Sequence, residues 1–121
     1  VIQTTQKLEF LQDVIKYLIP ISGELKLFNT ICKSTSKRQQ EAKELAKDSD
    51  LMVVVGSKQS ANTTHLAEIL QNITSTIHIE TSADLSRYKD LIKKSHNISV
   101  TAGASTPDNI IKDVINELEK Y

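Results

Sequence analysis

The feature that most constrains the fold is an unbroken apolar run, Leu51–Val55, with polar residues on both sides. The run is shorter than a typical buried helix, and it lacks the apolar–polar alternation of a strand that has one face in water. It therefore predicts a strand that is covered on both faces, as in a parallel sheet between two layers of helices.

Helical and strand-like patterns alternate around this run. Strands joined through helices by short connections form parallel sheets with right-handed crossovers. We therefore expect an α/β fold with a mostly parallel sheet flanked by helices. The further strands are expected at 25–28, 76–80 and 98–101, and the helices at 7–18, 36–47, from about 60–62 to 73, 83–94, and from Thr106 as N-cap with Pro107 as the first helical residue.

Composition excludes several classes of protein. The chain has 121 residues and a formal net charge of zero, so it offers no polybasic surface to attract nucleic acid or anionic lipid. No apolar run approaches the roughly 20 residues that a membrane-spanning helix needs. Aromatic residues are only 4% of the chain and Trp is absent, which leaves little from which to build a base-stacking surface. We expect a protein of the cytoplasm that binds neither nucleic acid nor membrane.

Three predicted strand-to-helix loops, at 29–35, 56–62 and 101–106, are rich in hydroxyl and amide side chains. In a parallel sheet these loops share the carboxyl edge, where ligands bind. Helix N-termini present unpaired N–H groups and partial positive charge, so three of them beside Ser, Thr and Asn side chains would suit a phosphate or diphosphate. The alternative is that these residues are ordinary helix N-caps. Neither a dinucleotide fingerprint nor a P-loop motif is present.

Cys32 is the single cysteine, so it cannot form an internal disulfide, and a reducing compartment is indicated. It could be a small buried apolar residue. It could also be a reactive thiolate, stabilised by the start of the following helix and by Lys33. As a metal or cluster ligand it would need partners from outside this sequence. The three histidines have no metal-ligand spacing and are interpreted as structural or surface residues.

Taken in order, a set of short motifs resembles the C-terminal portion of the LytB/IspH family, which is 4-hydroxy-3-methylbut-2-enyl diphosphate reductase. The resemblance covers almost the whole chain, and the order of the motifs makes it specific. The motifs are Gln3-Thr4-Thr5, Ile31-Cys32 with Thr35 and Arg38-Gln39, Val54-Val55-Gly56-Ser57-Lys58 with Ser60 and Asn62, and Thr101-Ala102-Gly103-Ala104-Ser105 followed by Pro107.

The resemblance implies a Rossmann-like third domain of a three-domain reductase. Residues 1–30 would be the tail of the second α/β domain and residues 31–121 the third. A 4Fe-4S cluster would lie between the domains, with Cys32 as one ligand and the other ligands outside this chain. The implied reaction is a reductive dehydroxylation to isopentenyl and dimethylallyl diphosphate in the non-mevalonate isoprenoid pathway, with ferredoxin or flavodoxin as electron donor.

The resemblance also assigns site residues. Thr4 would assist proton delivery near the substrate hydroxyl, and Thr35 would lie close to the same place. The substrate's diphosphate would bind to Ser60, Asn62 and Ser105. At Ala61 many family members have a second serine between the two binding residues, so the hydrogen bond of that serine is expected to be missing here or replaced by one from a backbone N–H.

The sequence begins at Val1 rather than Met, so we expect a piece of a longer protein that is inactive alone. Its first helix is expected to bury its apolar stripe on the rest of the chain or on a second copy. Two other functions stay open. One is a phosphate-binding or protein-interaction domain without catalysis, and the other is a redox sensor that uses the Cys32 thiolate.

Overall fold

The computed structural model describes residues 8–28 and 33–121, with side chains described from residue 9 in the first stretch and from residue 36 in the second. The chain divides into two compact units, Val1–Lys37 and Arg38–Tyr121. Each unit is described by itself.

The first unit contains α1 (Leu8–Leu18), which confirms the predicted helix, and the 3-10 turn η1 (Ile19–Ile21). The Ser22 hydroxyl donates to the Leu18 carbonyl at 2.7 Å and so satisfies one of the carbonyls left free at the helix end. The strand predicted at 25–28 is wrong, since none of these residues is in a strand. A strand needs a partner for its backbone groups, and the described residues provide none here.

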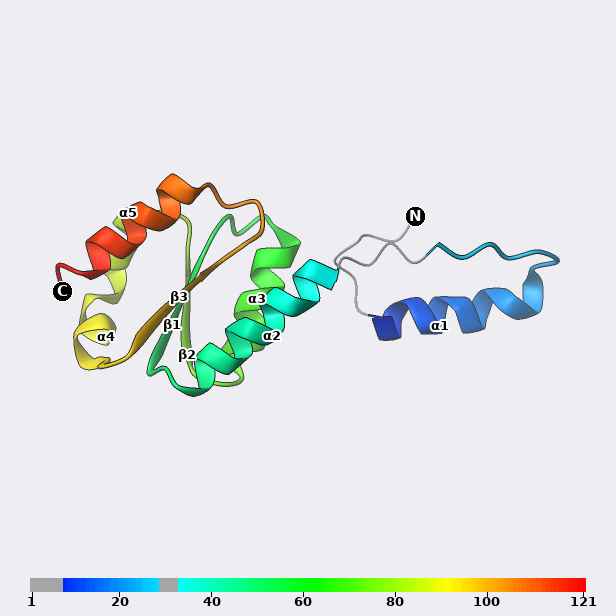
Figure 1. The fold of residues 1–121 in the computed structure, drawn as a ribbon, viewed down its shortest axis with the longest axis horizontal. Helices are drawn as coiled ribbons and strands as arrows, with labels where there is room; N and C mark the ends of the chain where they lie inside the picture. Colours follow the sequence, from blue (N-terminus) through cyan, green and yellow to red (C-terminus); the bar gives the residue numbers. More distant parts are fainter. Residues whose placement is uncertain (1–7, 29–32) are drawn as a thin grey trace. The chain divides into compact units, whose positions relative to one another are not determined.

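The second unit is a three-stranded parallel sheet with helices on both faces (Figure 1), as the strand–helix alternation predicted. The central strand β1 is exactly the predicted apolar run, and all of it is buried. Helix α2 (Lys33–Lys47) begins in the first unit and continues into the second from Arg38. The other elements of the second unit are β1 (Leu51–Val55), α3 (Ala61–Gln71), β2 (Ser75–Ile79), η2 (Ser82–Tyr88), α4 (Lys89–Lys94), β3 (Ile98–Ala102) and α5 (Asp108–Leu118).

The strand order is β2-β1-β3, so β1 lies between β2 and β3, and these two strands do not pair with each other although they follow one another in sequence. Val53 pairs with Ile77 on one side and with Val100 on the other, which sets the register of the whole sheet. The loops that follow β1 and β3 therefore meet at one edge, where both strands end.

Two core clusters explain why β1 is apolar at every position. Alternate side chains of a strand point to opposite faces. On one face Leu51, Val53 and Val55 pack with residues of β2, η2, α4 and α5. On the other face Met52 and Val54 pack with α2 and α3 residues, namely Ala42, Ala46, Leu66, Ala67 and Leu70.

Two predicted helix starts are corrected. Helix α2 begins at Lys33, three residues before the predicted Ser36. Helix α5 begins at Asp108 with Pro107 as N-cap, not at Pro107 with Thr106 as N-cap. Pro107 has an extended backbone (ψ 141°), and the Thr106 hydroxyl donates to the Val55 carbonyl instead of capping the helix.

The predicted helix over residues 83–94 is two elements, because residues Ser82–Tyr88 form a 3-10 helix and only Lys89–Lys94 are α-helical. Leu85, Tyr88 and Leu91 are spaced three residues apart, and this spacing places them on one face of a 3-10 helix as well as of an α-helix. The strand ends differ from prediction by one residue, since β2 ends at Ile79 and β3 extends to Ala102.

Candidate anion-binding site

The loop between β1 and α3 is held in place by backbone and side-chain hydrogen bonds. Gly56 has a φ of 145°, a region that favours glycine, and its N–H donates to the Ile79 carbonyl at 2.9 Å. Ser60 is the N-cap of α3, as the sequence indicated. Its Oγ accepts from the Thr63 backbone N–H at 3.4 Å and from the Thr63 hydroxyl at 3.0 Å.

The loop between β3 and α5 packs directly against the first loop. The Gly103 N–H and the Thr106 hydroxyl both donate to the Val55 carbonyl, each at 3.0 Å. A Cβ added at Gly56 would lie 2.6 Å from the Thr106 Oγ1, and one added at Gly103 would collide with the Thr63 Oγ1. Both glycines are needed because the two loops approach each other too closely for larger residues.

These contacts bring the predicted residues Ser60, Asn62 and Ser105 to the same edge of the sheet, where α3 and α5 begin. The Ser60 oxygen accepts two hydrogen bonds, so its own proton is still available to donate. The half-buried Asn62 and the exposed Ser105 make no side-chain hydrogen bond to any residue that the structure describes. Each of them can still donate to a bound anion.

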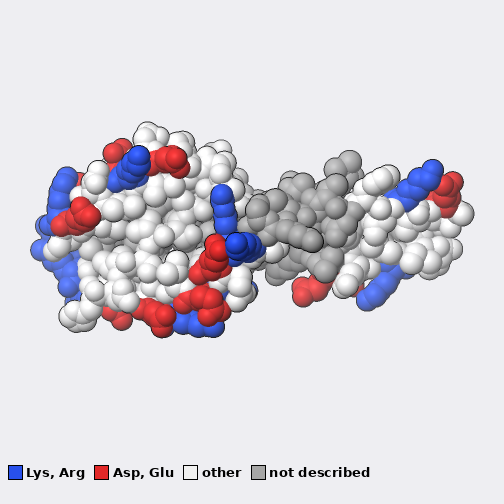
Figure 2. All heavy atoms as spheres, in the orientation of Figure 1, with Lys and Arg blue, Asp and Glu red and all other residues white. Residues whose placement is uncertain are grey.

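The charge at this edge is modest and mixed. Lys58 is the only basic residue between β1 and α3, and Asp108 occupies the first turn of α5. The pKa of Asp84 is held below its ordinary value, chiefly because its carboxylate accepts the backbone N–H groups of Glu80 and Thr81. On the face shown in Figure 2, basic and acidic side chains of the second unit are interspersed. Selectivity for an anion would therefore come from directed donors more than from net charge.

The side chains of three other predicted site residues are outside the part of the chain that the structure describes. Thr4 and Cys32 lie outside the described residues. Thr35 is in the first turn of α2, and its side chain is likewise outside the described part.

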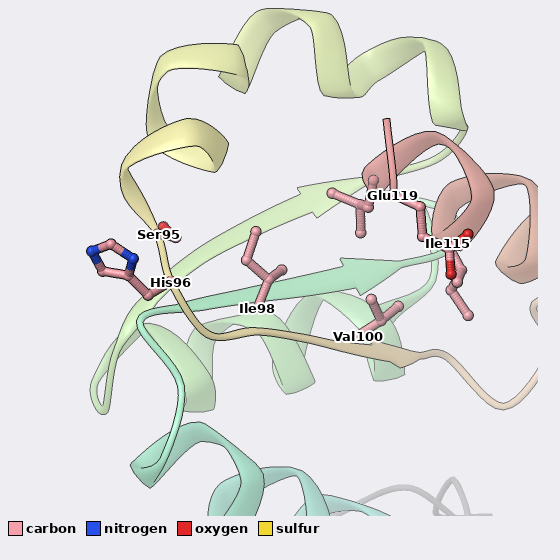
Figure 3. Close-up of a pocket in the computed structure, with 7 residues that line it drawn as sticks. Ser95, His96, Ile98, Val100, Ile115 and Glu119 are labelled. Atoms are coloured by element: carbon pink, nitrogen blue, oxygen red, sulfur yellow. The ribbon is translucent and has the colours of Figure 1, made fainter. Parts of the chain in front are cut away.

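A second hollow, of about 310 Å³, lies along the outer strand β3 (Figure 3). Ser95 and His96, just before the strand, mark one part of it, and Ile98 and Val100 line its strand side. Its lining mixes apolar and polar side chains. Helix α5 contributes Ile115 and Leu118, and Glu119 follows at the C-cap of that helix.

The described residues contain no group of three or more His, Cys, Asp or Glu side chains able to hold a metal ion. Within the same residues, no helix combines the length and the apolar character needed to cross a membrane.

Three residues that shape this edge were not among the predicted site residues, namely Thr63, His78 and Glu80, and Thr106 was predicted in a different role. Thr63 did leave a signal, because with Leu66, Ala67 and Leu70 it has helical spacing, and it is a polar residue at a buried position. His78 contacts the Gly56 carbonyl oxygen through its ring Nε2, and Glu80 accepts the Lys58 backbone N–H. Both contacts depend on the pairing of β2 with β1, which the sequence pattern does not give.

Comparison with known proteins identifies the family. The sequence model of the LytB protein family matches residues 1–119. The chain belongs to the LytB protein family. Two curated relatives of this LytB chain are both named 4-hydroxy-3-methylbut-2-enyl diphosphate reductase. The relative from Geobacter sulfurreducens is 43% identical over 122 residues, covering 100% of this chain and 43% of its own length. The relative from Clostridium acetobutylicum is 47% identical, covering 98% of this chain and 18% of its own length.

Solved structures agree with this LytB assignment. The structure of (E)-4-hydroxy-3-methyl-but-2-enyl diphosphate reductase, the terminal enzyme of the non-mevalonate pathway, matches with a TM-score of 0.76 and 38% identity. This match covers 98% of this chain and 42% of that one. The E-1-hydroxy-2-methyl-but-2-enyl-4-diphosphate reductase from Plasmodium falciparum matches with a TM-score of 0.72 and 26% identity, covering 94% of this chain and 36% of that one. The chain thus spans less than half the length of these LytB relatives.

Proposed function

We propose that this chain is part of a 4-hydroxy-3-methylbut-2-enyl diphosphate reductase and that its second unit holds the diphosphate of the substrate. The names of the relatives support the activity. One observation of the structure carries the diphosphate role. The loops that contain Ser60 and Ser105 lock together at the carboxyl edge of the sheet, beside the N-termini of two helices, and Asn62 lies in the first turn of one of these helices, α3.

The chemistry of this edge suits a diphosphate. The N–H groups of a helix's first turn have no partner within the helix, and they point at a ligand placed there. The hydroxyls of Ser60 and Ser105 and the amide of Asn62 would add hydrogen bonds to the charged oxygens. Hydrogen bonds to charged groups are stronger than those between neutral groups. These donors would fix the diphosphate end and so orient the rest of the substrate.

The remaining roles follow the family resemblance. Residues 1–30 would end one α/β domain and residues 31–121 would form the next, with Thr4 and Thr35 near the substrate hydroxyl. In the reaction two electrons and two protons are taken up, the C–O bond breaks, a C–H bond forms and the hydroxyl leaves as water. Thr4 would help to deliver a proton to this hydroxyl.

Cys32 would supply one thiolate ligand to a 4Fe-4S cluster. Thiolate is the donor that such clusters take, and a cluster usually needs several. Cys32 is the single cysteine of the sequence, so the other thiolate ligands would come from the rest of the protein. When bound, the cluster would supply electrons and a Lewis-acidic iron.

We also propose the wider setting of the enzyme. A ferredoxin or flavodoxin would donate the electrons in the cytoplasm. The isolated chain would lack catalytic activity and would self-associate through the exposed apolar residues of its first unit.

A test of the cluster compares this chain, the full-length protein and the full-length Cys32→Ser variant after anaerobic reconstitution. We expect iron and acid-labile sulfide in the full-length protein, a large loss in the variant, and no stable cluster in the chain alone. Equal, negligible iron in all three would overturn the reductase proposal and leave a phosphate-binding domain.

A test of the diphosphate site uses Asn62→Ala in the full-length enzyme, with Asn116→Ala on the exposed face of α5 as the matched control. Loss of one hydrogen bond to a charged group should lower kcat/KM about tenfold to hundredfold. The control should match the wild type. An unchanged kcat/KM in Asn62→Ala would remove this residue from the site.

A further inference from the structure

Two residues contact the β1–α3 loop at points that the proposed function does not use: His78 in β2, and Glu80 in the turn just after it. The His78 Nε2 lies 2.9 Å from the Gly56 carbonyl oxygen. The Glu80 Oε1 accepts the Lys58 backbone N–H, also at 2.9 Å. Because a carbonyl oxygen can only accept, the His78 Nε2 must carry the proton in this contact.

The register of the sheet explains both contacts. Val54 pairs with His78 and Val55 with Ile79, so β2 ends beside the point where β1 turns into the loop. The Gly56 N–H donates to the Ile79 carbonyl, so the ladder continues one residue past β1. His78 donates to the Gly56 carbonyl, so both the N–H and the C=O of Gly56 are hydrogen-bonded to β2.

Lys58 is held in the same way. Its N–H donates to Glu80 at 2.9 Å, and its carbonyl accepts the Thr64 hydroxyl at 3.1 Å. Glu80 is in turn fixed, because its own N–H donates to the Asp84 carboxylate at 3.1 Å. The loop that leads to Ser60 and Asn62 is therefore anchored to β2 before any ligand binds.

We propose that His78 and Glu80 are positioning residues that hold the β1–α3 loop in the shape that binds diphosphate. The proposal rests on the proposed function. Neither residue needs to touch the substrate. Anchoring the loop in advance lowers the ordering cost that the anion would otherwise have to offset.

Because Glu80 is charged, the proposal can be tested by whether its removal strengthens or weakens the binding of diphosphate. A carboxylate close to an anion site weakens anion binding by repulsion. If Glu80 acted only through charge, both Glu80→Ala and Glu80→Gln would bind diphosphate more tightly than the wild type. If it acts by holding Lys58, Gln keeps an acceptor oxygen and Ala does not. The two variants lose the same charge, so their difference isolates the hydrogen bond.

The experiment measures binding of inorganic diphosphate by calorimetry and exchange of the Lys58 amide proton by NMR, both on the present chain. We expect Glu80→Ala to bind about threefold to tenfold more weakly than Glu80→Gln, the range that one hydrogen bond provides. We also expect the Lys58 amide to exchange faster in Glu80→Ala only.

In His78→Phe, which keeps a ring but removes the donor, binding should weaken by a similar factor while the melting temperature changes little. The pair Glu119→Ala and Glu119→Gln, exposed at the end of α5, is the control and should show a ratio near one.

Each outcome has a distinct meaning. Equal binding by Glu80→Ala and Glu80→Gln, or unchanged Lys58 exchange in Glu80→Ala, would overturn the positioning role. If the wild-type chain binds no diphosphate while Lys58 exchange responds as expected, the loop is anchored but the diphosphate role of the edge fails. If the variants lose binding only in proportion to their melting temperature, the contacts stabilise the fold and the proposal is likewise overturned.

Discussion

The two units of the chain differ sharply in how far their apolar side chains are buried. Among the described residues, Leu11 is the only buried hydrophobic residue of the first unit, and the other buried hydrophobic residues all belong to the second. The first unit leaves most of its large apolar side chains exposed, including Tyr17 at 83%, Phe28 at 81% and Ile21 at 77%. The second unit has a core of its own, whereas the first has the apolar surface of an element that needs a partner.

This difference in burial indicates that the second unit provides most of the stability of the chain and also the donors of the candidate anion site. Strand β1 is covered on both faces. The loop that follows it ends at Ser60, and Asn62 lies in the first turn of α3. Rigid elements position a site better than mobile ones do. The second unit can therefore present its edge of donors without the first, and the comparison can be tested by treating the units separately.

The largest expected effect is on the free energy of unfolding. Leu70→Ala in the second unit removes a fully buried side chain and should cost about 2–5 kcal/mol. Ile21→Ala in the first unit removes a mostly exposed one and should change stability by less than about 0.5 kcal/mol. Urea unfolding followed by circular dichroism measures both. Similar losses in the two variants would contradict the comparison.

Glycine substitutions should also separate the units. Gly56→Ala places a side chain at a φ of 145° and against Thr106, so we expect a loss of about 1–3 kcal/mol. Gly23→Ala in the first unit meets nothing within 4 Å and should be neutral or slightly stabilising. Thermal unfolding measures the stability of both variants. A Gly56→Ala variant as stable as the wild type would mean that the two loops do not pack closely together.

Self-association should depend on the first unit. Sedimentation at rising concentration should show association of the wild-type chain, because Ile19 and Ile21 are 60% and 77% exposed. The double variant Ile19→Lys, Ile21→Lys should weaken association about tenfold or more, since burial of each isoleucine is worth about 1.5–3 kcal/mol when complete. Leu45→Lys, at a half-exposed position of the second unit, is the control and should associate like the wild type. A monomeric wild-type chain at high concentration would exclude this mode of assembly.

The smallest effect concerns the turn after β2. The pKa of Asp84 is lowered from 3.8 because its carboxylate accepts the Glu80 and Thr81 N–H groups, so the charged form stabilises the fold. This contribution is complete above the unfolded-state pKa and is lost as the pH falls through the lower folded-state pKa. Asp84→Asn should cost about 0.5–2 kcal/mol at neutral pH, and the difference from the wild type should shrink in acid below the ordinary Asp range. Asp113→Asn, at an exposed position of α5, should show neither effect in the same unfolding series.

The parts of the fold that were predicted correctly are those set by local pattern. The bounds of β1, Leu51–Val55, were predicted correctly at both ends. A short, continuous apolar run between amphipathic helices is typical of a strand that is buried on both faces. Ser60 was expected at the start of α3 and is its N-cap. The strand at 25–28 was wrong because a strand exists only when it is paired, and pairing is a property of the tertiary structure.

The candidate site was predictable only in part. The hydroxyl and amide residues of the loops were predicted as site residues because they follow strands. The hydrogen bonds and close contacts between the two loops could not be predicted in this way. Thr106 was expected to cap a helix and instead binds the Val55 carbonyl, a contact between residues 51 positions apart. Contacts of this kind follow from strand order, which the sequence leaves open.

The strand order β2-β1-β3 also has a consequence for the newly synthesised chain. When β2 emerges from the ribosome it can pair with β1, but the other edge of β1 stays open until α4 and β3 have been made. For that interval the most apolar segment of the protein exposes unpaired backbone groups, the condition under which nascent chains aggregate. A chaperone that shields Leu51–Val55 during this interval would raise the yield of folded protein without changing its final stability.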